Sequence, residues 1–192
     1  MTPVRLAAID LDGTLLDDQK RISAGNLVAL EHFLTHHGVV ALATARDCAS
    51  IQIKVPLTQP GLFYIGSGGA LICRASAQTL PWAKYVPPDL VATAVHFLQQ
   101  FDCPIFLNAE NDYWSDRYDD RVGMIEQRYN LTVRPFRKAS DVARSIMRIS
   151  LAAPAAVLRQ AAALAAVHLG DVLTVSLASP DWLDLLATQA GK

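Results

Sequence analysis

Two aspartates separated by one residue stand in the segment Asp10-Leu11-Asp12-Gly13-Thr14, directly after an apolar run. The side chains of a strand repeat with a period of two, so both carboxylates project to the same side where the strand ends. Two close carboxylates repel each other unless a cation or a shared proton relieves the repulsion. Because hard cations bind carboxylate and carbonyl oxygens, Asp10 and Asp12 are predicted to hold Mg²⁺, and an acidic turn without a ligand is the alternative.

A second polar segment, Thr44-Ala45-Arg46, follows another apolar run. A hydroxyl group and successive backbone amides at the start of a helix can hold phosphate oxygens, since helix N-termini favour anions. We therefore expect Thr44, Ala45 and Arg46 to bind phosphate, with a contact to a lid as another possible role for Arg46. A simple helix cap is the alternative interpretation of these residues.

Apolar runs and helical spacing predict the elements that must position these two segments. Strands are expected at residues 4–9, 39–43 and 62–65, with helices at residues 24–37 and 47–55 between them. This alternation predicts a doubly wound α/β unit with a parallel sheet over the first 70 residues. Its strands end at Asp10, Thr44 and Gly66, at the edge where such sheets bind their ligands.

The pattern changes after the third strand. A short hairpin is expected at residues 70–73 and 79–85, and Pro87-Pro88 marks a boundary or hinge. The remaining chain predicts an α+β unit with a mostly antiparallel sheet. Its helices are expected at 89–100, 120–129 and 155–168, and its strands at 105–108, 113–115, 146–152, 172–177 and 182–187.

The segment from Asp10 to Leu16 resembles the first motif of the haloacid dehalogenase-like phosphatases, and Thr44-Ala45-Arg46 resembles their second motif. The turn from Gly66 to Ala70 is similar to the Asn-Gly-Ala turn of the Cof-type subfamily, with Gly68 in the place of Asn. The resemblance implies a Rossmann-like doubly wound core at residues 1–84, to which residues 184–192 return. It also implies an inserted α+β cap (Cof-type, C2B-like) at residues 85–183.

The same resemblance implies a role for each matched residue. Asp10 would be the nucleophile that becomes an aspartyl-phosphate, and Asp12 would be the general acid and base. The Asp12 backbone carbonyl and Asp10 would bind Mg²⁺. The third motif is a lysine that neutralises charge on the phosphate, and Lys192, which follows Asp184 and a loop, is the candidate. The catalytic set is thus Asp10, Asp12 and Lys192, and Lys192 joins the phosphate-binding set.

The resemblance implies a Mg²⁺-dependent hydrolysis of a small phosphate monoester, a sugar phosphate or a phosphorylated cofactor. The fourth family motif, a Gly-Asp with a further Asp, would follow Lys192 and is not in the sequence. We therefore expect a chain truncated before this motif, which leaves open whether the chain alone turns over substrate. A phosphomutase of the same superfamily and a non-catalytic phosphate-binding protein are the alternatives.

The composition argues against nucleic acid and membrane partners. In 192 residues, 17 Lys and Arg stand against 18 Asp and Glu, so there is no basic excess to bind nucleic acid or anionic lipid. Arg5 and two aspartates interrupt the first apolar stretch, so we expect neither a signal peptide nor export. Cys48, Cys73 and Cys103 are expected to be reduced thiols in a cytoplasmic protein. The sequence does not predict the oligomeric state.

Overall fold

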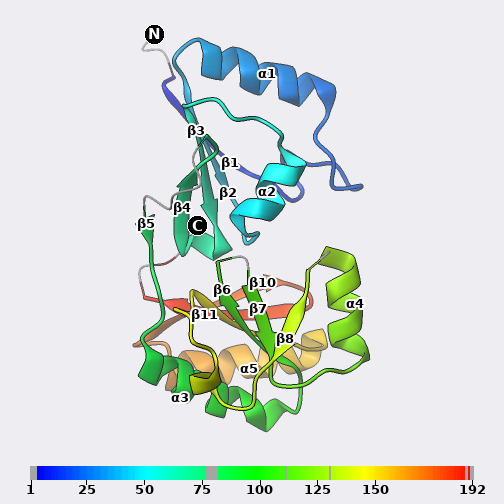
Figure 1. The fold of residues 1–192 in the computed structure, drawn as a ribbon, viewed down its shortest axis with the longest axis vertical. Coiled ribbons are helices and arrows are strands. Elements are labelled where there is room, and N and C mark those ends of the chain that lie inside the picture. The colour runs from blue at the N-terminus through cyan, green and yellow to red at the C-terminus, as the bar shows by residue number, and fades with distance from the viewer. Residues whose placement is uncertain (1–3, 77–81, 111, 130, 189, 191–192) are drawn as a thin grey trace. The chain divides into compact units, whose positions relative to one another are not determined.

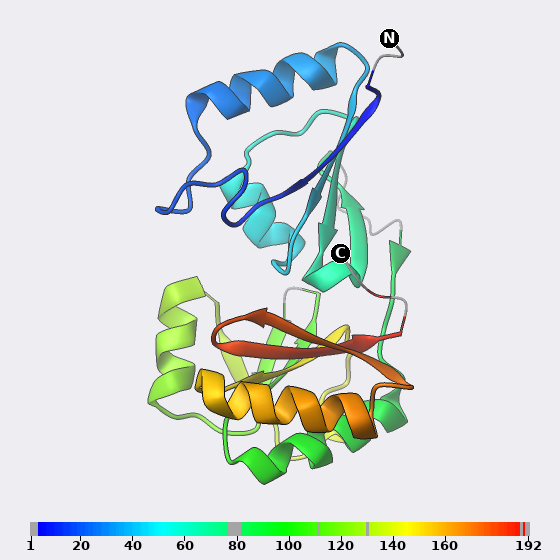
Figure 2. The ribbon, with the colours of Figure 1, turned by 180° about the vertical axis from the view of Figure 1, so that it is seen from behind.

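The computed structural model describes residues 4–76, 82–110, 112–129, 131–188 and 190. The chain divides into two compact units, Met1–Ala83 with Gly191–Lys192, and Lys84–Ala190. Each unit has its own sheet, seen in Figures 1 and 2. Among the described residues, no helix combines the length and the apolar content that a membrane crossing requires.

The first unit is built on a five-stranded sheet in the order β1-β2-β3-β4-β5. The first three strands run parallel, and the last two are antiparallel to their neighbours. The helices α1 and α2 lie on the same face of this sheet (Figures 1 and 2), as two right-handed crossovers that advance in one direction must. The elements are β1 (Leu6–Asp10), α1 (Ala24–Thr35), β2 (Val39–Ala43), α2 (Cys48–Lys54), β3 (Leu62–Gly66), the 3₁₀ turn η1 (Ser67–Gly69), β4 (Leu71–Arg74) and β5 (Trp82–Ala83).

Both helices of the first unit begin at a side-chain cap. The Ser23 hydroxyl accepts a hydrogen bond from the Asn26 amide at 3.1 Å, and the Asp47 carboxylate accepts one from the Ser50 amide at 2.6 Å. These caps satisfy amides that have no partner within the first turn. The short helix α2 is held on the sheet by Ile51, which is fully buried.

The second unit has a six-stranded sheet in the order β10-β11-β9-β6-β7-β8, antiparallel except for the β7–β8 pair. Helices α3 and α5 cover one face, where the larger apolar core lies, and Val122 of α4 packs with Phe106 and Ala152 in a smaller core. The elements are α3 (Pro88–Leu98), η2 (Gln99–Phe101), β6 (Ile105–Ala109), β7 (Asp112–Ser115), α4 (Asp120–Tyr129), β8 (Val133–Pro135), η3 (Ala139–Asp141), β9 (Arg148–Ala152), α5 (Ala155–His168), β10 (Leu173–Ser179) and β11 (Trp182–Ala187).

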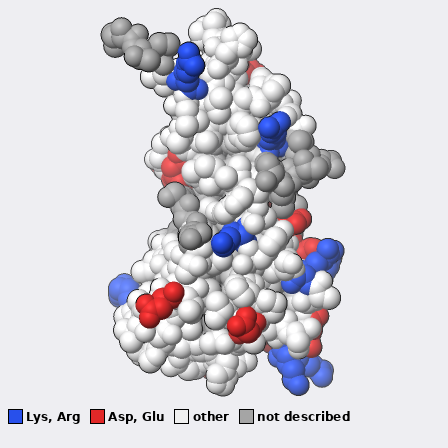
Figure 3. Space-filling view, turned by 90° about the vertical axis from the view of Figure 1, so that its left-hand side faces the viewer, with Lys and Arg blue, Asp and Glu red and all other residues white. Residues whose placement is uncertain are grey.

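Basic and acidic side chains of the described residues are scattered over the face drawn in Figure 3, which is mostly uncharged. This distribution is in keeping with the near balance of charges in the sequence.

Residues 184–188 do not return to the first unit, contrary to the sequence-based expectation. Strand β11 pairs antiparallel with β10 and β9, so Asp184 lies in the sheet of the second unit. The buried Asp184 carboxylate accepts a hydrogen bond from the Ser150 hydroxyl at 2.6 Å and lies 3.5 Å from Arg148. The β10–β11 hairpin keeps the strand beside its neighbour in the chain, which a motif match does not reveal.

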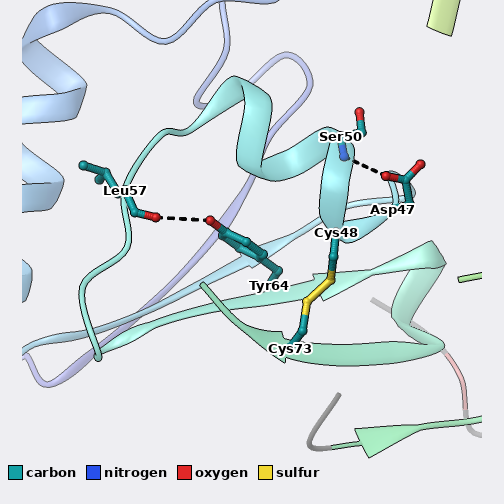
Figure 4. Close-up of a disulfide and its surroundings, with 6 residues drawn as sticks. All are labelled: Asp47, Cys48, Ser50, Leu57, Tyr64 and Cys73. Atoms are coloured by element: carbon teal, nitrogen blue, oxygen red, sulfur yellow. Dashed lines mark hydrogen bonds between the residues drawn. A yellow bond between two sulfur atoms is a disulfide. The ribbon is translucent and has the colours of Figure 1, made fainter. Parts of the chain in front are cut away.

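The prediction that all three cysteines are reduced is wrong for two of them. Cys48 and Cys73 form a disulfide, whereas Cys103 is free (Figure 4). The two half-cystines are 25 residues apart in sequence, and the fold brings the start of α2 over β4. In the chain-entropy model, closing a loop of this length stabilises the folded unit by about 3.5 kcal/mol.

Tyr64 provides a test of the first unit's packing. It is 2% exposed, its hydroxyl donates to the Leu57 carbonyl at 3.3 Å (Figure 4), and burial raises its pKa to about 12. The folded state therefore holds this proton more tightly than the unfolded chain, whose tyrosines titrate near pH 10. We expect the free energy of unfolding to fall between pH 10 and 12, through ionisation of Tyr64 in the unfolded chain.

The measurement is urea unfolding at several alkaline pH values, together with an ultraviolet titration of tyrosine. The change Tyr64→Phe should remove the latest tyrosine step and flatten the decline in stability. A Tyr64→Phe protein with an unchanged titration curve would contradict the assignment.

Candidate functional site

Three strand ends of the first unit meet at one edge of the sheet. Asp10, the last residue of β1, is in register with Ala43, the last residue of β2, and Thr44 follows directly. The Thr44 amide donates to the Ile65 carbonyl of β3 at 2.9 Å. The structure thus brings Asp10 and Thr44 together, because the carboxyl ends of parallel strands lie at the same edge.

The loop after β1 is anchored by apolar side chains. Leu11 is fully buried, and its carbonyl accepts from the Leu16 amide at 2.9 Å. Gly13 has φ +82°, a conformation that strains residues with a side chain. Leu11 faces the core, and the aspartates on either side of it are less buried. Asp10 and Asp12 are therefore the residues of this segment that can face a ligand at the strand ends.

Arg46 and Lys20 hold the Asp12 carboxylate. The Arg46 guanidinium donates through Nε at 2.8 Å and through Nη2 at 2.9 Å, and Lys20 Nζ lies 3.0 Å from Oδ1 of Asp12. The hydrogen bonds from Arg46 are the largest cause that lowers the pKa of Asp12 to about 2. Two cations therefore keep this carboxylate ionised. They also relieve its repulsion with Asp10, a role that the sequence predicted for Mg²⁺.

Arg46 links three segments of the site. Its Nη1 donates to the Ser50 hydroxyl of α2 at 3.3 Å, and its amide donates to the Thr44 hydroxyl at the same distance. Its carbonyl accepts from the Ser67 amide in the glycine-rich turn at 2.7 Å. In this structure the guanidinium predicted to bind phosphate is engaged with Asp12.

The glycine-rich turn packs closely against the Thr44–Asp47 loop. A Cβ atom at Gly66 would lie 2.9 Å from the Arg46 carbonyl, so a larger residue there would push the loop away. Ser67, which is buried, and Gly68 both have positive φ values, and the Gly68 amide donates to the Thr44 carbonyl at 3.2 Å. The turn thus fixes the backbone of the predicted phosphate-binding loop.

Lys20 is the site residue that the sequence analysis missed. It lies in a tight turn closed by Asp17 and Arg21, where the Asp17 amide donates to the Arg21 carbonyl at 2.9 Å. Lys20 itself has a positive φ of 60°. The sequence does show a lysine that follows Asp10 and Asp12 within one short loop. Many surface lysines stand at a similar distance from an aspartate, so this spacing alone did not predict an ion pair.

The donor atoms at this edge suit a hard cation that keeps part of its water shell. Mg²⁺ binds oxygen ligands and commonly uses one or two carboxylates with waters. The Asp10 carboxylate and the Asp12 carbonyl provide such oxygens, while the Asp12 carboxylate is held by Arg46 and Lys20. Within the described ranges there is no group of three His, Cys, Asp or Glu residues with metal-binding geometry. Lys192 lies outside the described residues.

The link between Arg46 and Asp12 predicts a shift that NMR can measure. In Arg46→Ala, the Asp12 carboxylate loses its main hydrogen bonds, so its pKa should rise from about 2 toward its ordinary value of 3.8. Since the folded-state pKa is the lower one, this group stabilises the fold above pH 4, and the contribution is lost as the pH falls toward 2. The measurement is a carbon-13 titration of labelled aspartates, with Lys20→Met expected to cause a smaller shift. Equal Asp12 titrations in wild type and Arg46→Ala would contradict the role of Arg46.

Comparison with known proteins gives the family of the chain and the relatives of its fold. A family model described as haloacid dehalogenase-like hydrolase matches residues 7–192. HMP-PP phosphatases from Yersinia pestis (strain Pestoides F) and from Yersinia pseudotuberculosis serotype O:1b (strain IP 31758) are each 33% identical over 118 residues, or 60% of this chain. The match spans 42% of the length of these curated relatives.

Solved structures share the fold at low sequence identity. A haloacid dehalogenase-like hydrolase from Bacteroides thetaiotaomicron superposes with a TM-score of 0.83 at 17% identity, over 98% of this chain and 73% of that one. A haloacid dehalogenase-like hydrolase from B. subtilis gives a TM-score of 0.83 at 16% identity, over 98% of this chain and 75% of that one. The α/β architecture predicted from the sequence is therefore confirmed.

Proposed function

Because this chain belongs to the haloacid dehalogenase-like hydrolases, we propose that it is a phosphatase that hydrolyses a small phosphate monoester with Mg²⁺ as cofactor. The observation that carries the proposal is the meeting of Asp10 with Thr44 and the Asp12–Arg46 pair at adjacent strand ends. The curated relatives named HMP-PP phosphatase support phosphate hydrolysis as the class of reaction.

Asp10 is the proposed nucleophile. One of its carboxylate oxygens forms a bond to phosphorus as the bond from phosphorus to the ester oxygen breaks, which yields an aspartyl-phosphate and an alkoxide. Asp12 in its protonated form gives its proton to the alkoxide. The resulting carboxylate takes a proton from the water that attacks the aspartyl-phosphate, which restores Asp10 and releases phosphate. The ion pairs with Arg46 and Lys20 favour the ionised form of Asp12, so they support its role as proton acceptor, and its role as donor requires that these cations move to the phosphate.

The charge on the phosphoryl oxygens needs several donors and cations. The Thr44 hydroxyl accepts from the Arg46 amide, so its own proton is suited to a phosphate oxygen. The Arg46 guanidinium and Lys192 are proposed to add positive charge there. When bound at Asp10 and the Asp12 carbonyl, Mg²⁺ would neutralise further charge on the phosphate.

The proposed substrate is a small phosphorylated metabolite. One solved structure with this fold, at 14% identity, is titled a sugar phosphatase, and the curated relatives are named for HMP-PP. Both names, together with the resemblance in the motifs, support a sugar phosphate or a phosphorylated cofactor. We propose that the protein acts in the cytoplasm, where such metabolites occur.

A phosphate-binding protein without turnover is the second candidate. The observation that favours it is the engagement of the Asp12 carboxylate by two cations, with no third acidic ligand beside Asp10 and Asp12 in the described part of the chain. Such a site would hold an anion without completing the reaction.

Replacement of the nucleophile tests the mechanism. We expect Asp10→Asn to lower the Mg²⁺-dependent hydrolysis of p-nitrophenyl phosphate by at least about 1,000-fold, because an amide does not form the acyl phosphate. Asp17→Asn is the matched control, since Asp17 lies in the same loop and its carboxylate binds Arg21. Undiminished hydrolysis by Asp10→Asn would contradict the covalent mechanism. Vanadate binding without any hydrolysis by the wild type would favour the phosphate-binding protein.

Replacement of Thr44 tests the phosphate-binding loop. Thr44→Val keeps the shape of a 2% exposed side chain and removes its hydroxyl. The loss of one hydrogen bond to phosphate should weaken the binding of inorganic phosphate by about tenfold, as measured by calorimetry. Thr44→Ser retains the hydroxyl and should bind within about twofold of the wild type. Equal affinities in all three proteins would rule out Thr44 as a phosphate ligand.

A further inference from the structure

The Cys48–Cys73 disulfide lies beside the proposed phosphate-binding loop (Figure 4). We propose that this disulfide is a redox-controlled clasp: the oxidised bond holds residues 44–50 in the arrangement that binds phosphate, and its reduction releases them. The inference rests on the proposed function for its effect on phosphate binding. Its effect on the loop itself is independent of that function.

The disulfide attaches the first residue of α2 to the sheet. Cys48 follows Asp47, the cap residue, and Cys73 lies on β4 in register with Tyr64 of β3. In Figure 4 the disulfide runs from the lower side of α2 to the strand beneath it. The covalent bond is therefore made at the end of α2 that is nearest to Thr44 and Arg46.

A chain of contacts connects this end of α2 to the candidate site. Ser50 lies in the same helical turn as Cys48, and its hydroxyl accepts from Arg46 Nη1 at 3.3 Å. The opposite side of the Arg46 guanidinium holds Asp12 through two hydrogen bonds. A displacement of the first turn of α2 would thus remove a hydrogen-bond partner from the side chain that positions Asp12.

The helix has few other anchors. It comprises seven residues, and isolated helices of this length are not stable in water. Two fully buried side chains also anchor it, Ile51 at the middle of the helix and Val55, which follows its last residue. Near its beginning, the helix is held by the Asp47 cap, by Arg46 and by the disulfide, so the bond contributes a large share of the restraint there.

Reduction of the bond requires a thiol reductant, and the surroundings indicate which sulfur is attacked. Cys48 is partly exposed, whereas Cys73 is only 5% exposed. A thiolate of a dithiol reductant bonds to Sγ of Cys48, and Sγ of Cys73 leaves and takes up a proton. The second thiol of the reductant then displaces Cys48, which leaves two protein thiols and one disulfide in the reductant. Two electrons and two protons pass to the protein in total.

Cys103 provides a matched control in the second unit. It is free, and burial raises the pKa of its thiol, which lowers the fraction of reactive thiolate. A redox response that depends on Cys103 would therefore have an origin other than the clasp.

The experiment compares the oxidised full chain with the same chain treated with dithiothreitol. Calorimetry measures the binding of inorganic phosphate, and hydrogen exchange follows the amides of Ser50 and Ile51, which donate to Asp47. Reduction should weaken phosphate binding by at least about fivefold and speed up the exchange of both amides. Cys48→Ser should show the reduced behaviour with and without dithiothreitol, and Cys103→Ser should respond as the wild type does.

Unchanged phosphate affinity together with unchanged exchange on reduction would overturn the proposal. A response that persists in Cys48→Ser would also overturn it. Cys73→Ala removes the bond without changing a residue of α2, so it should reproduce the effect of Cys48→Ser. A Cys73→Ala protein that behaves like the oxidised wild type would show that the serine itself alters the helix start, and would overturn the proposal. Faster exchange on reduction, in a protein that binds no phosphate in either state, would support the clasp and contradict the proposed function.

Discussion

The pair of hydrogen bonds from the Arg46 guanidinium to the Asp12 carboxylate is the interaction on which the candidate site depends. It connects the loop after β1 with the loop after β2, the two loops that a parallel sheet brings to one edge. Without a partner, the Asp12 carboxylate would repel Asp10 at the end of β1. Arg46 and Lys20 remove this cost and keep Asp12 ionised, which is the state that a proton acceptor requires.

Three separate restraints act on the segment that carries Arg46. The glycine-rich turn binds its backbone through Ser67 and Gly68, the Asp12 carboxylate binds its side chain, and the disulfide fixes the helix that follows. A helix as short as α2 does not provide such order by itself. The restraints therefore explain how a seven-residue helix and a four-residue loop can present a hydroxyl and a guanidinium in fixed positions.

The second unit is stabilised mainly by the apolar core between its sheet and two helices. Its sheet is almost entirely antiparallel, and α3 and α5 cover one face over a continuous apolar core. The opposite face carries a smaller core under α4 and a polar cluster of the buried Asp184 and Ser150 with the partly buried Arg148. A buried ion pair contributes little to stability after its desolvation, so packing of the apolar face is what stabilises this unit. Each unit thus has its own sheet and its own helices.

The sequence by itself determined the family, the parallel first unit and the mixed second unit. It also predicted the helices 120–129 and 155–168, because periodic apolar spacing is a local property. The strand ends at Asp10 and Thr44 followed from two apolar runs, so their meeting could be anticipated. Tertiary structure alone decided the partner of Arg46, the contribution of Lys20, the Cys48–Cys73 bond and the place of β11. These depend on which segments distant in sequence lie side by side, and local periodicity carries no information about such pairings.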